Sequence, residues 1–309
     1  QRRNLLKPSF LIMLKDVLRF NRIAVKELLT VDQSTTISDF LKRHNFSSHF
    51  IENYIIPMGA AIWSTAAEKT TEMPAAFYIR FFKNHGLLQV FNRPQWFVIK
   101  GGSKSYVKKI IAGFKENILL SSAVKGVVRT PDGVMIYHDK DKDPIKFDKV
   151  IFATHSDQAL ALLKDPSDNE LSILSALPYQ KNIAILHTDN SLMPKIKTTW
   201  SSWNYLLSGD PGKPVTLTYN MNILQSLDAQ PDFLVTLNSS SEIDPTKIIK
   251  KIEYHHPLFT VDGVKAQKRK TEISGANNTF YCGAYWGNGF HEDGVHSALE
   301  VCKDFGVLL

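Results

Sequence analysis

The sequence predicts a mixed α/β (α+β) fold, and three patterns carry that prediction. The N-terminal part spaces its apolar residues at three- and four-residue steps, which indicates helices. The middle of the chain contains short apolar or alternating runs separated by prolines and glycines, which indicates strands. Residues 148–163 and 279–301 each combine a strand, a turn and a helix, a succession typical of α/β proteins.

Composition is that of an ordinary globular protein. Of the 309 residues, 43% are hydrophobic and 22% are charged, which is enough apolar material for a sizeable core. No window approaches about eighteen apolar residues, so no membrane-spanning helix is predicted. The net charge of +7 could favour an anionic membrane surface or an acidic ligand, or it could serve solubility alone.

Several kinds of site are not predicted. The two cysteines, Cys282 and Cys302, form no Cys-x-x-Cys pair, and isolated thiols suit a reducing, cytoplasmic compartment. His291 and His296 are five residues apart and would not share one helical face, so no metal site is expected. The sequence has no G-x-S-x-G elbow, P-loop or basic recognition helix, which argues against a hydrolase of that type and against a nucleic-acid partner.

Three helices are predicted in the N-terminal part. Pro8 to Leu29 is amphipathic, Thr36 to Arg43 begins at a Thr-Ile-Ser-Asp signal, and Ala75 to Lys83 is rich in aromatic residues. The polar face of the first helix carries four basic residues, Lys15, Arg19, Arg22 and Lys26. That face could touch lipid headgroups or could simply be solvated.

The next segment changes from helices to strands. A strand is predicted from Trp96 to Ile99, followed by Gly101-Gly102 and by a helix that Ser103 can cap. Short apolar or alternating runs then predict strands at Ile118–Leu120, Val124–Arg129, Val134–His138 and Lys149–Ala153. Pro131-Asp132-Gly133 predicts a hairpin turn between the second and third of these strands.

A second, strand-rich region extends from Ser172 to Ser274. Its candidate strands are Ile183–Thr188, Trp203–Leu207, Val215–Tyr219 and Phe233–Asn238. Lys247 to Tyr254 is predicted to be a short helix. The aromatic residues of this region could line a cavity or could pack in the core.

The C-terminal stretch from Thr279 to Val301 carries the most specific pattern. A strand from Thr279 to Cys282 precedes a turn that contains three glycines, and a helix is expected from Val295. A helix N-terminus suits an electron-rich oxygen or a developing anion, and glycines let a ligand approach the backbone. An ordinary strand-to-helix turn would show the same glycines, so spacing alone leaves both interpretations open.

The run GAYWGNGFHEDGVHSALE resembles the C-terminal cofactor segment of flavin-containing amine oxidases and of phytoene-desaturase-like and protoporphyrinogen-oxidase-like enzymes. The resemblance implies that Gly283 ends the strand and that Asp293-Gly294 is the helix entrance. It also implies that Val295 offers a backbone N–H to the pyrimidine end of the flavin. The family often has an acidic residue where this chain has Ala284, so the ribityl contact made there is absent or supplied elsewhere.

Other residues take roles through the same resemblance. Val124 matches the position beside the adenine, and Ala153 and Thr154 match the strand end near the pyrophosphate; His155 is expected to pack or cap. Trp96 and Trp203 match the substrate side. The resemblance implies a partial FAD-binding Rossmann-like domain, formed by 101–165 and 273–309. It also implies a substrate domain with a mixed β-sheet and helices, formed by a helical segment 1–100 and a β-rich segment 166–272.

The resemblance further implies FAD chemistry, with hydride removed from an amine or an unsaturated, lipid-like substrate. No GxGxxG turn occurs, so the sequence is expected to be the C-terminal part of a longer protein that binds FAD, which this chain alone would bind poorly. His291 stands where amine oxidases have an aromatic residue facing the flavin, and it is the candidate catalytic residue.

No acidic cluster is present to attract a polyamine, which favours a hydrophobic substrate. The alternative is a non-catalytic protein that kept the fold to bind a lipid or a partner, and Ala284 and the absent GxGxxG favour it slightly. Peripheral membrane contact is compatible with either function.

Overall fold

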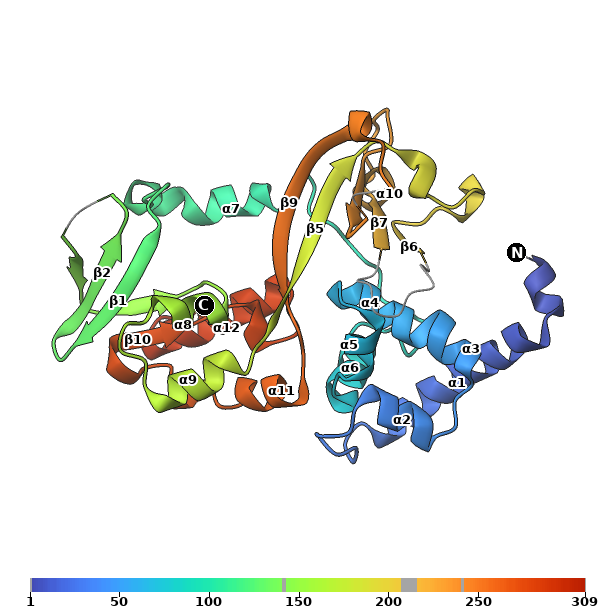
Figure 1. Ribbon diagram of the computed structural model, residues 1–309, viewed down its shortest axis with the longest axis horizontal. Coiled ribbons are helices and arrows are strands. Elements are labelled where there is room, and N and C mark those ends of the chain that lie inside the picture. The colour runs from blue at the N-terminus through green and yellow to red at the C-terminus, as the bar shows by residue number, and fades with distance from the viewer. Residues whose placement is uncertain (1, 141–142, 207–215, 240–241, 309) are drawn as a thin grey trace. The chain divides into compact units, whose positions relative to one another are not determined.

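A computed structural model describes residues 2–140, 143–206, 216–239 and 242–308 of the chain (Figure 1). The chain folds as two compact units, each built from two separate stretches of sequence. Unit 1 comprises Gln1–Ser105 and Gln180–His256, and unit 2 comprises Tyr106–Tyr179 and Pro257–Leu309. Helices and strands occur in both units, so the predicted mixed fold class is confirmed.

Unit 1 begins with helices. They are α1 (Pro8–Glu27), α2 (Ile37–Arg43), α3 (Ser48–Phe50), α4 (Ile56–Trp63), α5 (Ala67–Thr71) and α6 (Ala75–Asn84). The predicted start of α2 is confirmed, because the Thr36 hydroxyl accepts the backbone N–H of Asp39 at 3.1 Å. Aromatic rings fill the core between these helices: Phe20 meets the edges of Phe40 and Phe46, and Tyr78 stacks on Phe82.

A five-stranded sheet completes unit 1, in the order β6-β7-β8-β5-β9. Its strands are β5 (Tyr179–His187), β6 (Trp203–Leu206), β7 (Thr216–Asn220), β8 (Leu234–Leu237) and β9 (Ile248–Pro257), and a short helix α10 (Met221–Leu224) follows β7. The four predicted strands are therefore found, although Leu207 and Val215 lie outside the described residues.

The helix predicted for Lys247–Tyr254 is wrong, because this run is most of β9. The strand extends beside β5 at the edge of the sheet (Figure 1). Ile248, Ile249, Ile252 and Tyr254 have the branched or aromatic side chains that strands favour. The three- and four-residue apolar spacing is ambiguous over so short a run, and pairing with β5 decides the outcome.

Unit 2 contains two small sheets and the helices around them. The strands β1 (Val124–Thr130), β2 (Gly133–His138) and β3 (Ile145–Phe147) form an antiparallel meander, and β4 (Val150–Phe152) pairs in parallel with β10 (Thr279–Tyr281). The helices are α7 (Lys104–Ile110), α8 (Ser156–Leu162), α9 (Asp168–Ser175), α11 (Val261–Gln267) and α12 (His291–Asp304). The predicted hairpin turn is confirmed, since Thr130 faces Gly133 in the β1–β2 register.

Two predicted strands, Trp96–Ile99 and Ile118–Leu120, are wrong. Neither run pairs with a strand among the residues that the structure describes, so neither gains ladder hydrogen bonds. Phe97 is 86% exposed and Leu120 is 76% exposed, which shows that their apolar side chains do not anchor the backbone in a core.

Residues 166–179 and 257–272, which the resemblance grouped with the β-rich substrate segment, pack inside unit 2. Ile173 and Leu174 of α9 and Ala266 of α11 belong to one buried cluster with Val127 of β1 and Tyr281 of β10. The burial of these apolar side chains draws α9 and α11 to the small sheets.

A buried polar network ties this cluster together. The guanidinium of Arg129 donates to Glu170 Oε1 at 2.7 Å and to Oε2 at 3.0 Å, and the hydroxyl of Tyr281 donates to Glu170 Oε1. Burial opposes ionisation of the carboxyl group, but the hydrogen bonds from Arg129 and Tyr281 outweigh it and lower the pKa of Glu170 to about 2. The network joins β1, α9 and β10, and β1 also forms part of the wall of the site described next.

Candidate functional site

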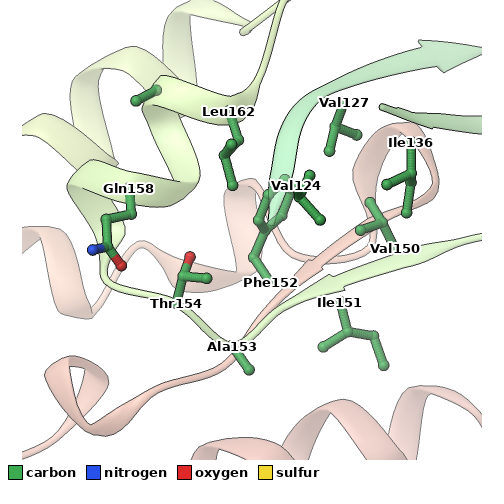
Figure 2. Close-up of a pocket in the computed structure, with 11 residues that line it drawn as sticks. Val124, Val127, Ile136, Val150, Ile151, Phe152, Ala153, Thr154, Gln158 and Leu162 are labelled. Atoms are coloured by element: carbon green, nitrogen blue, oxygen red, sulfur yellow. The ribbon is translucent and has the colours of Figure 1, made fainter. Parts of the chain in front are cut away.

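An apolar cavity of about 550 Å³ lies in unit 2 beside β4. Figure 2 shows its walls, which come from β1, β2, β4 and α8. The lining residues are Val124, Val127, Ile136, Val150, Ile151, Phe152, Ala153, Thr154, Gln158, Ala161 and Leu162. Three of the predicted cofactor-binding residues, Val124, Ala153 and Thr154, are thus brought to one cavity from parts of the chain about thirty residues apart.

The end of β4 positions the polar side of this cavity. The chain leaves β4 after Phe152 and enters α8 at Ser156, so Ala153, Thr154 and His155 form the connection. The ring of His155 stacks on Tyr179 with centroids 4.4 Å apart, and its backbone N–H donates to Gln158 Oε1 at 3.3 Å. The prediction that His155 packs is confirmed, and Thr154 and Gln158 are the polar side chains among apolar walls.

The glycine turn before α12 is held by side chains on both sides. Gln267 donates through Nε2 to the carbonyl oxygens of Tyr285 and Gly287, both at 2.7 Å. The Asp293 carboxylate accepts the backbone N–H of Phe290 at 3.0 Å, and Ser297 Oγ accepts the N–H of Gly283 at 2.8 Å. These hydrogen bonds fix the path of the backbone from the end of β10 to the first turn of α12.

The helix begins at His291, four residues earlier than the sequence predicted. The N–H of Gly294 already donates to the Phe290 carbonyl at 3.2 Å, and Val295 follows it into the second turn. A helical N–H at that position bonds the carbonyl four residues back, so it is not an open donor. Because α12 begins at His291, the backbone amides of His291, Glu292 and Asp293 are the ones without an intrahelical acceptor.

The structure gives different reasons for glycine at different positions of this segment. A Cβ on Gly283 would lie 2.5 Å from the ring of Tyr285, and one on Gly287 would lie 2.2 Å from Asp293 Oδ1, so the chain itself requires both glycines. A Cβ on Gly294 would meet nothing closer than the Ala284 nitrogen at 3.8 Å, which is ordinary contact. The described chain therefore has room for a side chain at Gly294 and gives no internal reason for its absence.

His291 has a partner that the sequence did not reveal. The hydroxyl of Tyr106, on α7, lies 2.8 Å from His291 Nδ1, and the two rings meet edge to face at 6.3 Å. The pair joins residues 185 positions apart in the chain. The single sequence signal near Tyr106 was Gly101-Gly102, both at positive φ, which mark the turn that leads into α7.

The predicted substrate-side residues lie in unit 1 in different surroundings. Trp203 on β6 meets Tyr219 on β7 edge to face at 5.3 Å, and the register puts Tyr205 on the same face of the sheet. Burial raises the pKa of Tyr219 to about 12, against a smaller lowering by a hydrogen bond with Ser64. Trp96 instead belongs to an irregular segment and is 63% exposed. Its ring is stacked on that of His85, with the ring centroids 6.0 Å apart.

The described residues contain neither a metal-binding group nor a membrane-spanning helix. Among the residues that the structure describes, no three His, Cys, Asp or Glu side chains are grouped so that they could hold a metal ion. Within the same described ranges, no helix combines the length and the apolar character needed to cross a bilayer.

Comparison with solved structures identifies the fold. A fatty acid isomerase from P. acnes that produces CLA is 14% identical over 97% of this chain and 76% of its own, with a TM-score of 0.69. Putrescine oxidase with bound putrescine is 10% identical over 97% and 76% of the two chains, with a TM-score of 0.65. A protein described as a putative protoporphyrinogen oxidase from Exiguobacterium sp. 255-15 is 14% identical over 92% and 71%, with a TM-score of 0.59.

Comparison of the sequence identifies the family. Among curated proteins, the search gave no significant match. The family profile described as flavin containing amine oxidoreductase matches residues 4–220, which is well over half of the chain. That match begins just before α1 and ends with β7, so it does not include the C-terminal glycine turn that carries the resemblance. The chain therefore belongs to the flavin-containing amine oxidoreductase family.

Proposed function

We propose that this chain forms the flavin-facing turn and the substrate-facing sheet of an FAD-dependent oxidoreductase that removes a hydride from a hydrophobic, lipid-like substrate. One observation carries the proposal. Val124, Ala153 and Thr154, assigned to the cofactor through the family resemblance, line one cavity of about 550 Å³ although they come from β1 and from the end of β4. A cavity with apolar walls and few polar groups suits an aromatic base with a polar tail.

The residues of the cavity and of the turn fit FAD. The cavity walls would receive the adenine, while Thr154 and Gln158 supply polar groups towards the phosphates. The absent side chain at Gly294 leaves room for a planar ring against the start of α12. When bound, FAD supplies the hydride acceptor.

The chain's own contribution is electrostatic and positional. The open amides of His291, Glu292 and Asp293 carry the partial positive charge of the helix N-terminus, which stabilises negative charge that develops beside them. We assign the flavin contact to these three amides and not to the amide of Val295, because the Val295 amide lies inside the helix. The Asp293 carboxylate is held by the Phe290 N–H, so the cap keeps the first turn in place.

His291 would orient the substrate or move a proton. Its Nδ1 is engaged by the Tyr106 hydroxyl at 2.8 Å, which leaves Nε2 as the nitrogen that would contact a substrate. Held in this way, the imidazole has one defined orientation, which a positioned acid or base requires.

The aromatic face in unit 1 supports the proposed substrate class. The register aligns Trp203, Tyr219, Val235 and Leu186 across four strands, and Tyr205 is followed by Leu217 and Leu237 in the next row. These rows contain no carboxylate to pair with an ammonium group, so an unsaturated hydrocarbon chain suits this face better than a polyamine. Both classes occur on this fold, since one similar structure is a fatty acid isomerase and another is a putrescine oxidase.

The test uses the natural protein. We expect it to purify with FAD and its flavin to be bleached under anaerobic conditions by unsaturated fatty acids, more slowly or not at all by diamines. His291→Ala should keep the flavin but lower the rate of bleaching. A natural protein that binds no FAD would contradict the proposal, and one that binds FAD but is reduced by neither class would support a binding protein instead.

A further inference from the structure

Helix α1 presents large apolar side chains to solvent. Leu11, Leu14, Leu18 and Val25 are 49%, 40%, 54% and 47% exposed. The same helix buries Phe20 and Ala24 completely on its packed side. A surface helix ordinarily carries one apolar stripe, directed at the core, so the second stripe on α1 is not explained by folding of unit 1.

Helix geometry sets the two stripes on opposite sides. With 3.6 residues per turn, Asp16, Phe20 and Ala24 define the packed side. Leu11, Leu14, Leu18 and Val25 then fall within a stripe roughly 60° wide on the opposite side, directed away from the core. The exposed leucines are therefore one continuous surface along the helix.

Charge is distributed unevenly around this stripe. Lys15, Arg22 and Lys26 are exposed and follow one border of it. The helix has two acidic residues, Asp16 and Glu27, and both are engaged on the packed side: Asp16 accepts the Ser47 N–H at 2.9 Å, and Glu27 lies 3.1 Å from His44 Nε2. The outward surface of α1 thus combines leucines with cations and carries no carboxylate.

We propose that α1 lies on the surface of an anionic phospholipid membrane, with the leucine stripe among the upper acyl chains and the three cations at the phosphate level. An apolar stripe bordered by lysine and arginine matches the layering of a bilayer interface. Each cation close to an anionic surface adds attraction, and this attraction falls off within a Debye length, so cations far from α1 contribute little. This inference concerns α1 alone and does not depend on the flavin.

Vesicle flotation of the chain tests the proposal. We expect binding to phosphatidylcholine vesicles that contain phosphatidylglycerol, and little binding to phosphatidylcholine alone. The triple variant Lys15→Gln/Arg22→Gln/Lys26→Gln should lower the partition coefficient on the anionic vesicles by about a hundredfold, at about a factor of five for each cation. Leu14→Gln/Leu18→Gln should lower it by at least about tenfold.

Control variants test whether binding depends on the residues of α1 or on exposed charge and exposed leucine anywhere on the surface. Lys250→Gln/Lys251→Gln/Lys265→Gln removes the same charge from exposed positions elsewhere, and Leu171→Gln removes an exposed leucine of α9. Both controls should bind as the original chain does, and circular dichroism should show every variant folded. Equal binding by the α1 variants would overturn the proposal. Light scattering without lipid gives a second test. If the original chain is a dimer and Leu14→Gln/Leu18→Gln is a monomer, the proposal is also overturned, because the stripe would then form an interface between two copies.

Discussion

Replacing Gly294 with alanine should stabilise this chain while weakening its contact with FAD. Gly294 is the fourth residue of α12, and its N–H bonds the Phe290 carbonyl at 3.2 Å, so it already lies within the helical hydrogen-bond pattern. The added Cβ would lie 3.8 Å from the Ala284 nitrogen and 4.0 Å from the Ala284 Cβ. Neither contact requires a neighbour to move.

The magnitude follows from helix propensity. Glycine inside a helix is less stable than alanine by roughly 0.5–1 kcal/mol, and no clash reduces that gain here. The free energy of unfolding should rise by that amount, which corresponds to about 1–1.5 °C in Tm for a chain of 309 residues. If the cofactor ring lies against the same backbone, the methyl group displaces it and FAD binding should fall by about tenfold, the equivalent of one hydrogen bond.

Thermal unfolding of the flavin-free chain, followed by circular dichroism, measures the first effect, and FAD titration of the natural protein measures the second. Gly287→Ala is the matched control with the opposite expected sign. Its Cβ would lie 2.2 Å from Asp293 Oδ1, so the cap on Phe290 would have to move and Tm should fall. A Gly294→Ala chain that is less stable, or one with unchanged FAD affinity, would refute the assignment of this glycine to the cofactor.

The other predictions concern single contacts. Because the folded pKa of Glu170 is about 2, below its ordinary 4.5, its stabilisation is complete above about pH 4.5 and is lost as the pH falls towards 2. Denaturant titration should show a Glu170 contribution of up to about 3 kcal/mol that Glu170→Gln removes, while the acid dependence from Asp189, whose folded pKa is also about 2, remains. Tyr106→Phe should remove the preference for one His291 tautomer, seen in the nitrogen NMR shifts of the ring, without changing the fold. Asp293→Ala should cost about 1 kcal/mol in denaturant unfolding through the lost cap, whereas unchanged stability would show that the Phe290 N–H finds another acceptor. Trp203→Ala in the natural protein should weaken substrate binding but not FAD binding, and a loss of flavin would contradict its assignment to the substrate side.

Local signals in the sequence were sufficient for several elements and for the family. The Thr36 cap, the Pro131-Asp132-Gly133 turn and the strand–turn–helix at β4 and α8 each depend on neighbours within a few residues. The C-terminal glycine run indicated the family for the same reason, because its residue types are needed at fixed, short spacings. The resemblance also assigns Val124, Ala153 and Thr154 to the cofactor, and the structure shows that the three residues line one cavity.

Only the tertiary structure decided the features that depend on distant partners. The spacing of apolar residues in Ile248–Pro257 is compatible with a helix or a strand. Pairing with β5 decides that this run is the strand β9. Conversely, Trp96–Ile99 has the composition of a strand but finds no partner strand in the described chain. The Tyr106–His291 and Arg129–Glu170 pairs span 185 and 41 positions, and local spacing carries no information about such contacts. The sequence by itself thus determined the residue types at the site, and packing of the two stretches of unit 2 decided which of them meet, because burial of a shared core and not local spacing brings distant residues together.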